Sequence, residues 1–132
     1  LANYKSDLIA AVASVSGVML DCTGSTSHPM PVVHLHGTSD GVLPYNGNND
    51  WNSAQSTLDH WVNFNNTVLT PTITSDNNIE RYVYDQGDSS VSVEHYKFIG
   101  GDHVWFSATY QGQSTSELVW NFVSRYDING LR

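Results

Sequence analysis

The sequence of 132 residues predicts one domain of the α/β class, with a mostly parallel sheet flanked by helices. Two short apolar runs, residues 8–15 and 32–36, are typical of strands that are covered on both faces. Two later segments, residues 53–64 and 114–125, repeat apolar side chains at the helical period. Buried strands that alternate with amphipathic helices indicate a parallel sheet with helices packed against it.

The first two predicted strands each end at a glycine. The opening segment, residues 6–17, is apolar almost throughout and closes with Ser16 and Gly17. A loop rich in Ser, Thr and Gly follows, and the second strand occupies residues 32–36. A long polar loop over residues 41–52 then separates this strand from the first helix.

Both predicted helices begin with a capping residue. Ser53 stands where the N-cap of the first helix is expected, directly before its apolar repeat. Ser114 and Glu117 have the spacing of a capping box at the start of the last helix.

Between the helices, residues 79–84 and 91–99 alternate apolar and polar side chains, which is typical of strands. A turn is expected between them over residues 86–90. The predicted order is therefore strand, strand, helix, strand, strand, helix.

The composition excludes several classes of function. Thirteen acidic side chains oppose five basic ones, so the net charge of −8 argues against binding to nucleic acid. No apolar stretch has the length of a membrane span, and no membrane partner is expected. The single cysteine, Cys22, permits no disulfide within the chain and is expected to pack as a small apolar residue.

Two residues that carry chemistry follow predicted strands. Asp40 lies in the loop after residues 32–36, and His103 lies in the loop after residues 91–99. An acid after one strand and a histidine after a later one is the order of a Ser–Asp–His triad. In such a triad the histidine accepts a proton from the nucleophile, and the acid fixes its tautomer.

The motifs around these residues resemble those of a known family. Residues 36–40 read His-Gly-Thr-Ser-Asp, residues 43–45 read Leu-Pro-Tyr, and residues 100–105 read Gly-Gly-Asp-His-Val-Trp. With these motifs the chain resembles the C-terminal half of α/β-hydrolases of the extracellular polyhydroxybutyrate depolymerase and feruloyl esterase group, which is carbohydrate esterase-like. The last helix is also similar to the closing helix of that group.

The resemblance implies a role for each matching residue. Asp40 would be the triad acid and His103 the general base, while Trp105, Tyr45 and Pro44 would line or shape the substrate cleft. The group needs no cofactor and no metal, and its members act outside the cell, so a secreted or periplasmic location is expected.

The nucleophile elbow of the group is not found in this sequence. Residues 1–17 resemble the segment that follows the elbow helix, so residues 1–132 are expected to form a partial domain that lacks the N-terminal half. The cysteine pair that many members carry is also absent, since Thr67 and Gln86 stand in the corresponding regions.

Ser39 is a weak candidate for the nucleophile. Residues 37–41 match the pattern Gly-x-Ser-x-Gly letter for letter. The elbow requires a strand before the serine and a helix directly after it, and residues 42–47 do not begin a helix. The favoured interpretation is that Ser39 is a turn residue beside the acid.

Other polar residues are expected to have structural roles. His34 and His36 are two apart on one strand and face the same way, but no third metal ligand is suitably spaced, so packed histidines are favoured over a zinc site. Asp102 is expected to shape its loop or to be solvated. His28, His60 and His95 show no partner pattern.

Two hypotheses for function follow. The first is a serine-hydrolase-type carboxylic ester hydrolase that uses an Asp–His pair on polyhydroxyalkanoate, feruloyl or short-chain esters. The alternative is a non-catalytic truncated relative, or a fragment, that binds a partner or ligand. In both cases the uncovered edge of a partial sheet predicts a homodimer or association with a complementing N-terminal fragment.

Overall fold

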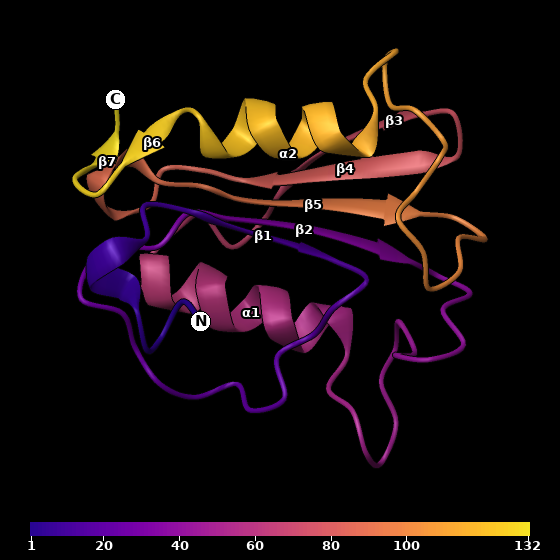
Figure 1. The fold of residues 1–132 in the computed structure, drawn as a ribbon, viewed down its shortest axis with the longest axis horizontal. Helices are drawn as coiled ribbons and strands as arrows, with labels where there is room; N and C mark the ends of the chain where they lie inside the picture. Colours follow the sequence, from indigo (N-terminus) through magenta and orange to yellow (C-terminus); the bar gives the residue numbers. More distant parts are fainter.

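A five-stranded mixed sheet lies between two helices in the computed structural model, which describes residues 1–132 (Figure 1). The strand order across the sheet is β1-β2-β5-β4-β3. The strands are β1 (Val12–Val15), β2 (Val32–Gly37), β3 (Thr72–Asp76), β4 (Ile79–Tyr84) and β5 (Val93–Phe98). The pairs β1–β2 and β2–β5 are parallel, whereas β5–β4 and β4–β3 are antiparallel.

The antiparallel half of the sheet follows from its short connections. Asn77 and Asn78 join β3 to β4, and both have positive φ angles, 51° and 58°, as a tight hairpin turn requires. A short connection containing the 3₁₀ turn η2 (Asp88–Ser90) joins β4 to β5. Parallel neighbours need a much longer crossover, so these strands pair antiparallel. The sheet is therefore mixed, and the structure does not show the mostly parallel sheet that the sequence predicts.

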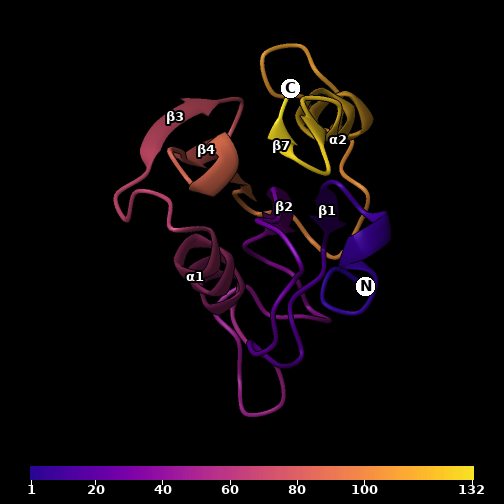
Figure 2. The same cartoon turned by 90° about the vertical axis from the view of Figure 1, so that its left-hand side faces the viewer.

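The two helices cover opposite faces of the sheet (Figure 2). Helix α1 (Ala54–Asn65) begins after Ser53, whose side chain accepts a hydrogen bond from the backbone of Ser56. Helix α2 (Thr115–Val123) begins after Ser114, and the capping box with Glu117 is formed in both directions. Both predicted N-caps are thus confirmed.

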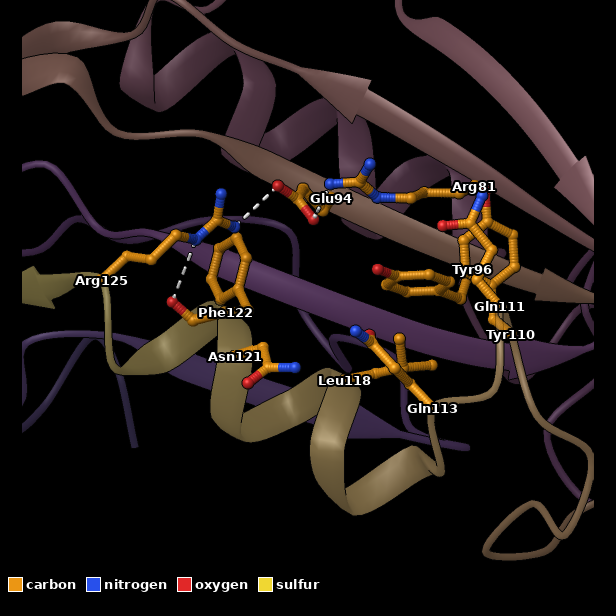
Figure 3. Close-up of a pocket in the computed structure, with 10 residues that line it drawn as sticks. All are labelled: Arg81, Glu94, Tyr96, Tyr110, Gln111, Gln113, Leu118, Asn121, Phe122 and Arg125. Atoms are coloured by element: carbon orange, nitrogen blue, oxygen red, sulfur yellow. Dashed lines mark hydrogen bonds and ion pairs between the residues drawn. The ribbon is translucent and has the colours of Figure 1, made fainter.

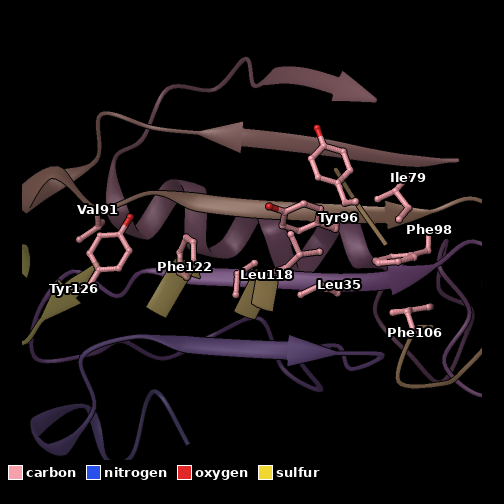
Figure 4. Packing of buried hydrophobic residues seen from close by; sticks show 11 residues of the cluster. Leu35, Ile79, Val91, Tyr96, Phe98, Phe106, Leu118, Phe122 and Tyr126 are labelled. Atoms are coloured by element: carbon pink, nitrogen blue, oxygen red, sulfur yellow. The ribbon is translucent and has the colours of Figure 1, made fainter. Parts of the chain in front are cut away.

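A hydrophobic core fills each side of the sheet. On the α2 side, Leu118 and Phe122 of the helix belong to one cluster with Val33 and Leu35 of β2 (Figure 4). On the α1 side, the buried cluster consists of Met30, Val32, Leu58, Trp61, Val62, Tyr84 and Val93. Strand β2 is buried along its whole length, as its continuous apolar run predicts.

Strand β1 is less covered than expected. It lies at the edge of the sheet, pairs with β2 alone, and leaves Ala13 exposed. The 3₁₀ turn η1 (Ser6–Leu8) occupies the first part of the segment predicted as one strand. At the other end of the chain, β6 (Tyr126–Asp127) and β7 (Gly130–Leu131) form a small hairpin.

Both chain ends lie toward the end of the sheet at which β2 and β5 begin (Figure 1). The loops that follow β2 and β5 lie at the opposite end. Neither helix is long and apolar enough to cross a membrane.

Candidate active site

The loops that carry Asp40 and His103 leave the same end of the sheet. Strands β2 and β5 are adjacent and parallel, so the chain leaves both strands at the same end of the sheet, which their arrowheads mark (Figure 1). The residues that follow, 38–45 and 99–105, are therefore brought together. In sheets with parallel strands, ligands bind at loops beyond the carboxyl ends of those strands.

Close backbone packing joins the two loops. A Cβ atom added to Gly37 would lie 2.2 Å from the carbonyl oxygen of Gly101, so this approach requires glycine. The Ser39 N–H donates a hydrogen bond to the same carbonyl over 2.9 Å. The Gly100 N–H donates to the hydroxyl of Thr38 over 2.7 Å. The two loops form one hydrogen-bonded unit.

Two further side chains shape the histidine loop. Asp102 accepts hydrogen bonds from the backbone N–H groups of Gly41 (3.3 Å) and His103 (2.7 Å), which is the loop-shaping role expected for it. Ser16, the residue after β1, donates to the carbonyl oxygen of Val104 over 2.9 Å. Ser16 was not among the predicted site residues, since this contact joins positions 88 apart in the chain and leaves no local pattern.

Asp40 and His103 form a hydrogen-bonded pair. Nδ1 of His103 lies 2.9 Å from Oδ2 of Asp40. The other carboxylate oxygen, Oδ1, accepts from the backbone N–H groups of Val42 and Leu43, each over 2.8 Å. Burial raises the pKa of Asp40, but the hydrogen bonds from Leu43, Val42 and His103 outweigh burial and hold this pKa below its ordinary value. The carboxylate is therefore charged near neutral pH and fixed in orientation.

The pairing leaves one nitrogen of His103 available. Because Nδ1–H donates to Asp40, the neutral ring carries its acceptor lone pair on Nε2. The His103 side chain is 37% exposed, whereas the Asp40 side chain is fully buried. A buried acid behind an accessible imidazole is the arrangement in which histidine acts as a general base.

The imidazole of His36 also lies close to the Asp40 carboxylate. Nε2 of His36 lies 2.8 Å from the carbonyl oxygen of Leu43 and 3.3 Å from Oδ2 of Asp40. The carbonyl requires the proton to be on Nε2, so this N–H also faces the carboxylate. His36 is fully buried, and its Nδ1 has no hydrogen-bond partner. Two histidines, His36 and His103, thus lie close to the same oxygen of Asp40.

The other strand histidines form a separate hydrogen-bonded chain. The Tyr45 hydroxyl lies 2.7 Å from Nε2 of His95, and Nδ1 of His95 lies 3.0 Å from Nδ1 of His34. Nε2 of His34 in turn lies 2.6 Å from the carbonyl oxygen of Gly17. A single set of tautomers satisfies this chain, with protons on the Tyr45 hydroxyl, on Nδ1 of His95 and on Nε2 of His34.

Burial keeps these two histidines neutral. It lowers the pKa of His34 to about 4 and lowers the pKa of His95 well below its ordinary value. His34 and His36 do face the same way and stack with ring centroids 5.4 Å apart. No group of three or more His, Cys, Asp and Glu side chains in the chain is arranged to hold a metal ion.

Ser39 lies on an exposed turn in the loop that follows β2. Its backbone N–H bonds to Gly101, and its hydroxyl makes no hydrogen bond to His103. Strand β2 is followed by a loop that continues to the start of α1, so the strand–turn–helix of an elbow is not formed around this serine. No other hydroxyl or thiol side chain hydrogen-bonds to His103 either.

The predicted cleft residues lie in different surroundings. Trp105, beside His103, is 61% exposed. Tyr45 and Pro44 are half-buried, and the Tyr45 hydroxyl is bound to His95 rather than directed to solvent. None of these three residues lines a cavity; a cavity of about 350 Å³ touches the histidine loop at positions that include Gly101 and Val104.

Comparison with known proteins gives one match of note. No family model matches the chain. Over 129 residues it is 29% identical to a bifunctional acetylxylan esterase/xylanase of Neocallimastix patriciarum. The chain is thus similar to part of a protein that is named as both an acetylxylan esterase and a xylanase. The match covers 92% of this chain and 17% of that protein, so the chain spans about a sixth of the length of its relative.

Proposed function

We propose that this chain is the acid- and base-bearing part of a serine-hydrolase-type carboxylic ester hydrolase. The observation that carries the proposal is the 2.9 Å hydrogen bond between His103 and the buried carboxylate of Asp40. These residues come from loops 63 positions apart in the chain and are held at the carboxyl end of adjacent parallel strands. The similarity to a protein named as an esterase supports the same class of reaction.

The geometry gives each member of the pair one task. Nε2 of His103 accepts the proton of a serine hydroxyl as that oxygen attacks the ester carbonyl, and the imidazolium then gives the proton to the leaving alcohol. Asp40 holds the Nδ1 tautomer and stabilises the imidazolium. In the second half of the reaction, His103 deprotonates water as it attacks the acyl carbonyl. The acyl–serine bond then breaks, the imidazolium returns its proton to the serine oxygen, and the acyl group leaves as a carboxylic acid.

The attacking serine is proposed to come from outside these 132 residues, because no hydroxyl in the chain hydrogen-bonds to His103. A complementing N-terminal segment would supply it at the exposed face of the imidazole. Acetyl groups on xylan are the substrate that the relative suggests, with feruloyl, short-chain and polyhydroxyalkanoate esters as related carboxylic esters.

The test is hydrolysis of p-nitrophenyl acetate and butyrate by the purified chain. Without a serine nucleophile, we expect slow turnover in which His103 activates water. His103→Ala should reduce this rate to that of buffer, a loss of about 100-fold if the base contributes at the lower end of its usual range. Asp40→Asn should reduce the rate in the same direction, since it removes the charge behind the imidazole.

Three controls separate the alternatives. His60→Ala removes a half-buried histidine away from the pair and should leave the rate unchanged. Ser39→Ala should also retain the rate, and a fluorophosphonate probe should leave no stoichiometric adduct. An adduct on Ser39 would assign the nucleophile to this chain. Equal rates for the parent chain and His103→Ala would contradict catalysis by Asp40 and His103 and would favour a non-catalytic binding fragment.

A further inference from the structure

A second polar cavity lies on the α2 side of the sheet, between α2 and strands β4 and β5 (Figure 3). Its volume is about 240 Å³. In Figure 2, α2 and the β3–β4 hairpin are separated from each other, and both lie above strands β1 and β2. The lining combines charged, amide and tyrosine side chains: Arg81, Glu94, Tyr96, Tyr110, Gln111, Gln113, Leu118, Asn121, Phe122 and Arg125.

The cavity concentrates positive charge in an acidic protein. Arg81 and Arg125 are two of only five basic side chains in a chain of net charge −8. Both bind the buried carboxylate of Glu94, Arg81 through Nη2 over 3.1 Å and Arg125 through Nη2 over 2.7 Å. Glu94 is the only acidic residue in the lining, so the lining keeps one net positive charge.

Each guanidinium retains unused donors. Arg81 and Arg125 each give a single N–H group to Glu94, although a guanidinium offers five. Nε of Arg81 is buried and has no hydrogen-bond partner. A buried donor without a partner is costly. The donors that remain for a ligand are the Nη groups of the two guanidinium groups that Glu94 does not use.

The rest of the lining is suited to a hydroxylated ligand. Figure 3 shows the Tyr96 hydroxyl directed into the space beside the two arginines. Tyr96 and Tyr110 also line the cavity and meet edge to face, with ring centroids 5.4 Å apart. Gln113 and Asn121 add amide groups from the α2 side. Amides both donate and accept, as recognition of neighbouring hydroxyl groups requires.

We propose that this cavity binds a small carboxylate that carries several hydroxyl groups, of the uronic acid class. The ligand carboxylate would accept from the free N–H groups of Arg81 and Arg125, which are well suited to carboxylate oxygens. The hydroxyl groups would bond to Gln113, Asn121 and Tyr96. An inorganic anion such as phosphate would leave the amides and the Tyr96 hydroxyl without partners.

This site is distinct from the proposed catalytic pair. None of its lining residues hydrogen-bonds to Asp40 or His103. The two proposals can therefore fail separately: ligand binding here requires no ester hydrolysis, and loss of His103 should not alter it.

The test is a ¹H–¹⁵N NMR titration of the whole chain with D-glucuronate. We expect saturable shifts at Tyr96, Gln113 and Asn121 with a dissociation constant on the order of 1 mM, which is typical of a ligand of this size. Glucose, which has the same ring without the carboxylate, should bind at least about tenfold more weakly. Phosphate should not reproduce the shifts at Gln113 and Asn121. The natural ligand is either free glucuronate or a glucuronate group attached to a polysaccharide. The methyl glycoside of glucuronate distinguishes these two sources, since only a site open to polysaccharide side groups would accept it.

Two variants keep the proposal falsifiable. Arg81→Gln leaves Glu94 paired with Arg125 and should weaken glucuronate binding by about tenfold or more. Asn121→Ala changes an exposed side chain, so the fold is not at risk, and should weaken binding by about three- to tenfold. Lys5→Gln is the matched control, because it removes an exposed cation outside the cavity. Equal affinities for glucuronate and glucose, or binding unaffected by Arg81→Gln and Asn121→Ala, would overturn the assignment.

Discussion

His36 and His103 both lie close to Oδ2 of Asp40, at 3.3 Å and 2.9 Å. His36→Phe keeps the ring volume but removes the N–H group that reaches Leu43 and Asp40. We expect the free energy of unfolding to fall by about 1–3 kcal/mol, because the half-buried Leu43 carbonyl loses its donor. The pKa of Asp40 should rise, because its carboxylate loses a nearby N–H group. Urea denaturation measures the first effect and ¹³C NMR titration of the Asp40 carboxyl the second.

His60→Phe is the matched control for this change. His60 also bonds to a backbone carbonyl, that of Cys22, through Nδ1 over 3.1 Å, but it makes no contact with Asp40. The His60→Phe substitution should lower the free energy of unfolding without changing the pKa of Asp40. The same Asp40 titration in His36→Phe as in the parent chain would contradict a supporting role for His36.

His34 makes stability depend on pH in mildly acidic solution. Its pKa is lowered from 6.5 to about 4 by burial, so between these values the unfolded chain binds a proton that the folded chain does not. The free energy of unfolding should therefore decrease as pH falls from 6.5 to 4, by about 3 kcal/mol from this residue. Urea denaturation at several pH values measures the slope, which should be shallower in His34→Gln. An unchanged slope would show that His34 is protonated alike in both states.

At the scale of residues, short motifs made Asp40 and His103 predictable. Each belongs to a local pattern after a strand, and the structure joins the two. The contact of His95 with His34 and Tyr45 has no such pattern, since it depends on the register that places His34 opposite His95. Hydrogen bonds across strands far apart in sequence leave no trace in the spacing of residues.

At the scale of elements, the approach of Gly37 to Gly101 holds the end of β2 against the loop after β5. Gly37→Ala should separate these loops, lower stability by about 1–3 kcal/mol and broaden or shift the His103 NMR signals. Gly41→Ala is the control, because the nearest atom to its Cβ would be 3.9 Å away. Thermal unfolding and a ¹H–¹⁵N spectrum test both variants. A Gly37→Ala chain as stable as Gly41→Ala would show that the loops tolerate separation.

Elements with a clear apolar face were predicted, and those without one were missed. Strand β2 is recognisable as a continuous run because all of its residues are buried. Both helices are recognisable because their buried apolar side chains recur at the helical period. Strand β3 is exposed along its whole length, so its sequence Thr-Ile-Thr-Ser-Asp shows no buried alternation. The sheet is mixed for two reasons: β4 and β5 pair antiparallel across their short connection, and the missed strand β3 forms a hairpin with β4.

At the scale of the whole molecule, β1 forms an open edge of the sheet. A homodimer joined through this edge remains a prediction, because pairing of two β1 strands would satisfy their free backbone groups. Light scattering after size exclusion should give twice the chain mass of 14.6 kDa. Ala13→Lys places a charge on the exposed side of β1 and should shift the protein toward monomer, whereas Ser75→Lys on β3 should not. A parent chain that is monomeric at high concentration would contradict the dimer.

The placement of the chain ends decides how the molecule can be attached to a surface. Both ends lie toward the end of the sheet at which β2 and β5 begin, away from the loops of Asp40 and His103 (Figure 1). Protein attached to a sensor chip or bead through either terminus would thus present His103 to the solution. Immobilised protein should bind soluble ligands at those loops as well as free protein does, and either terminus serves equally for a tether.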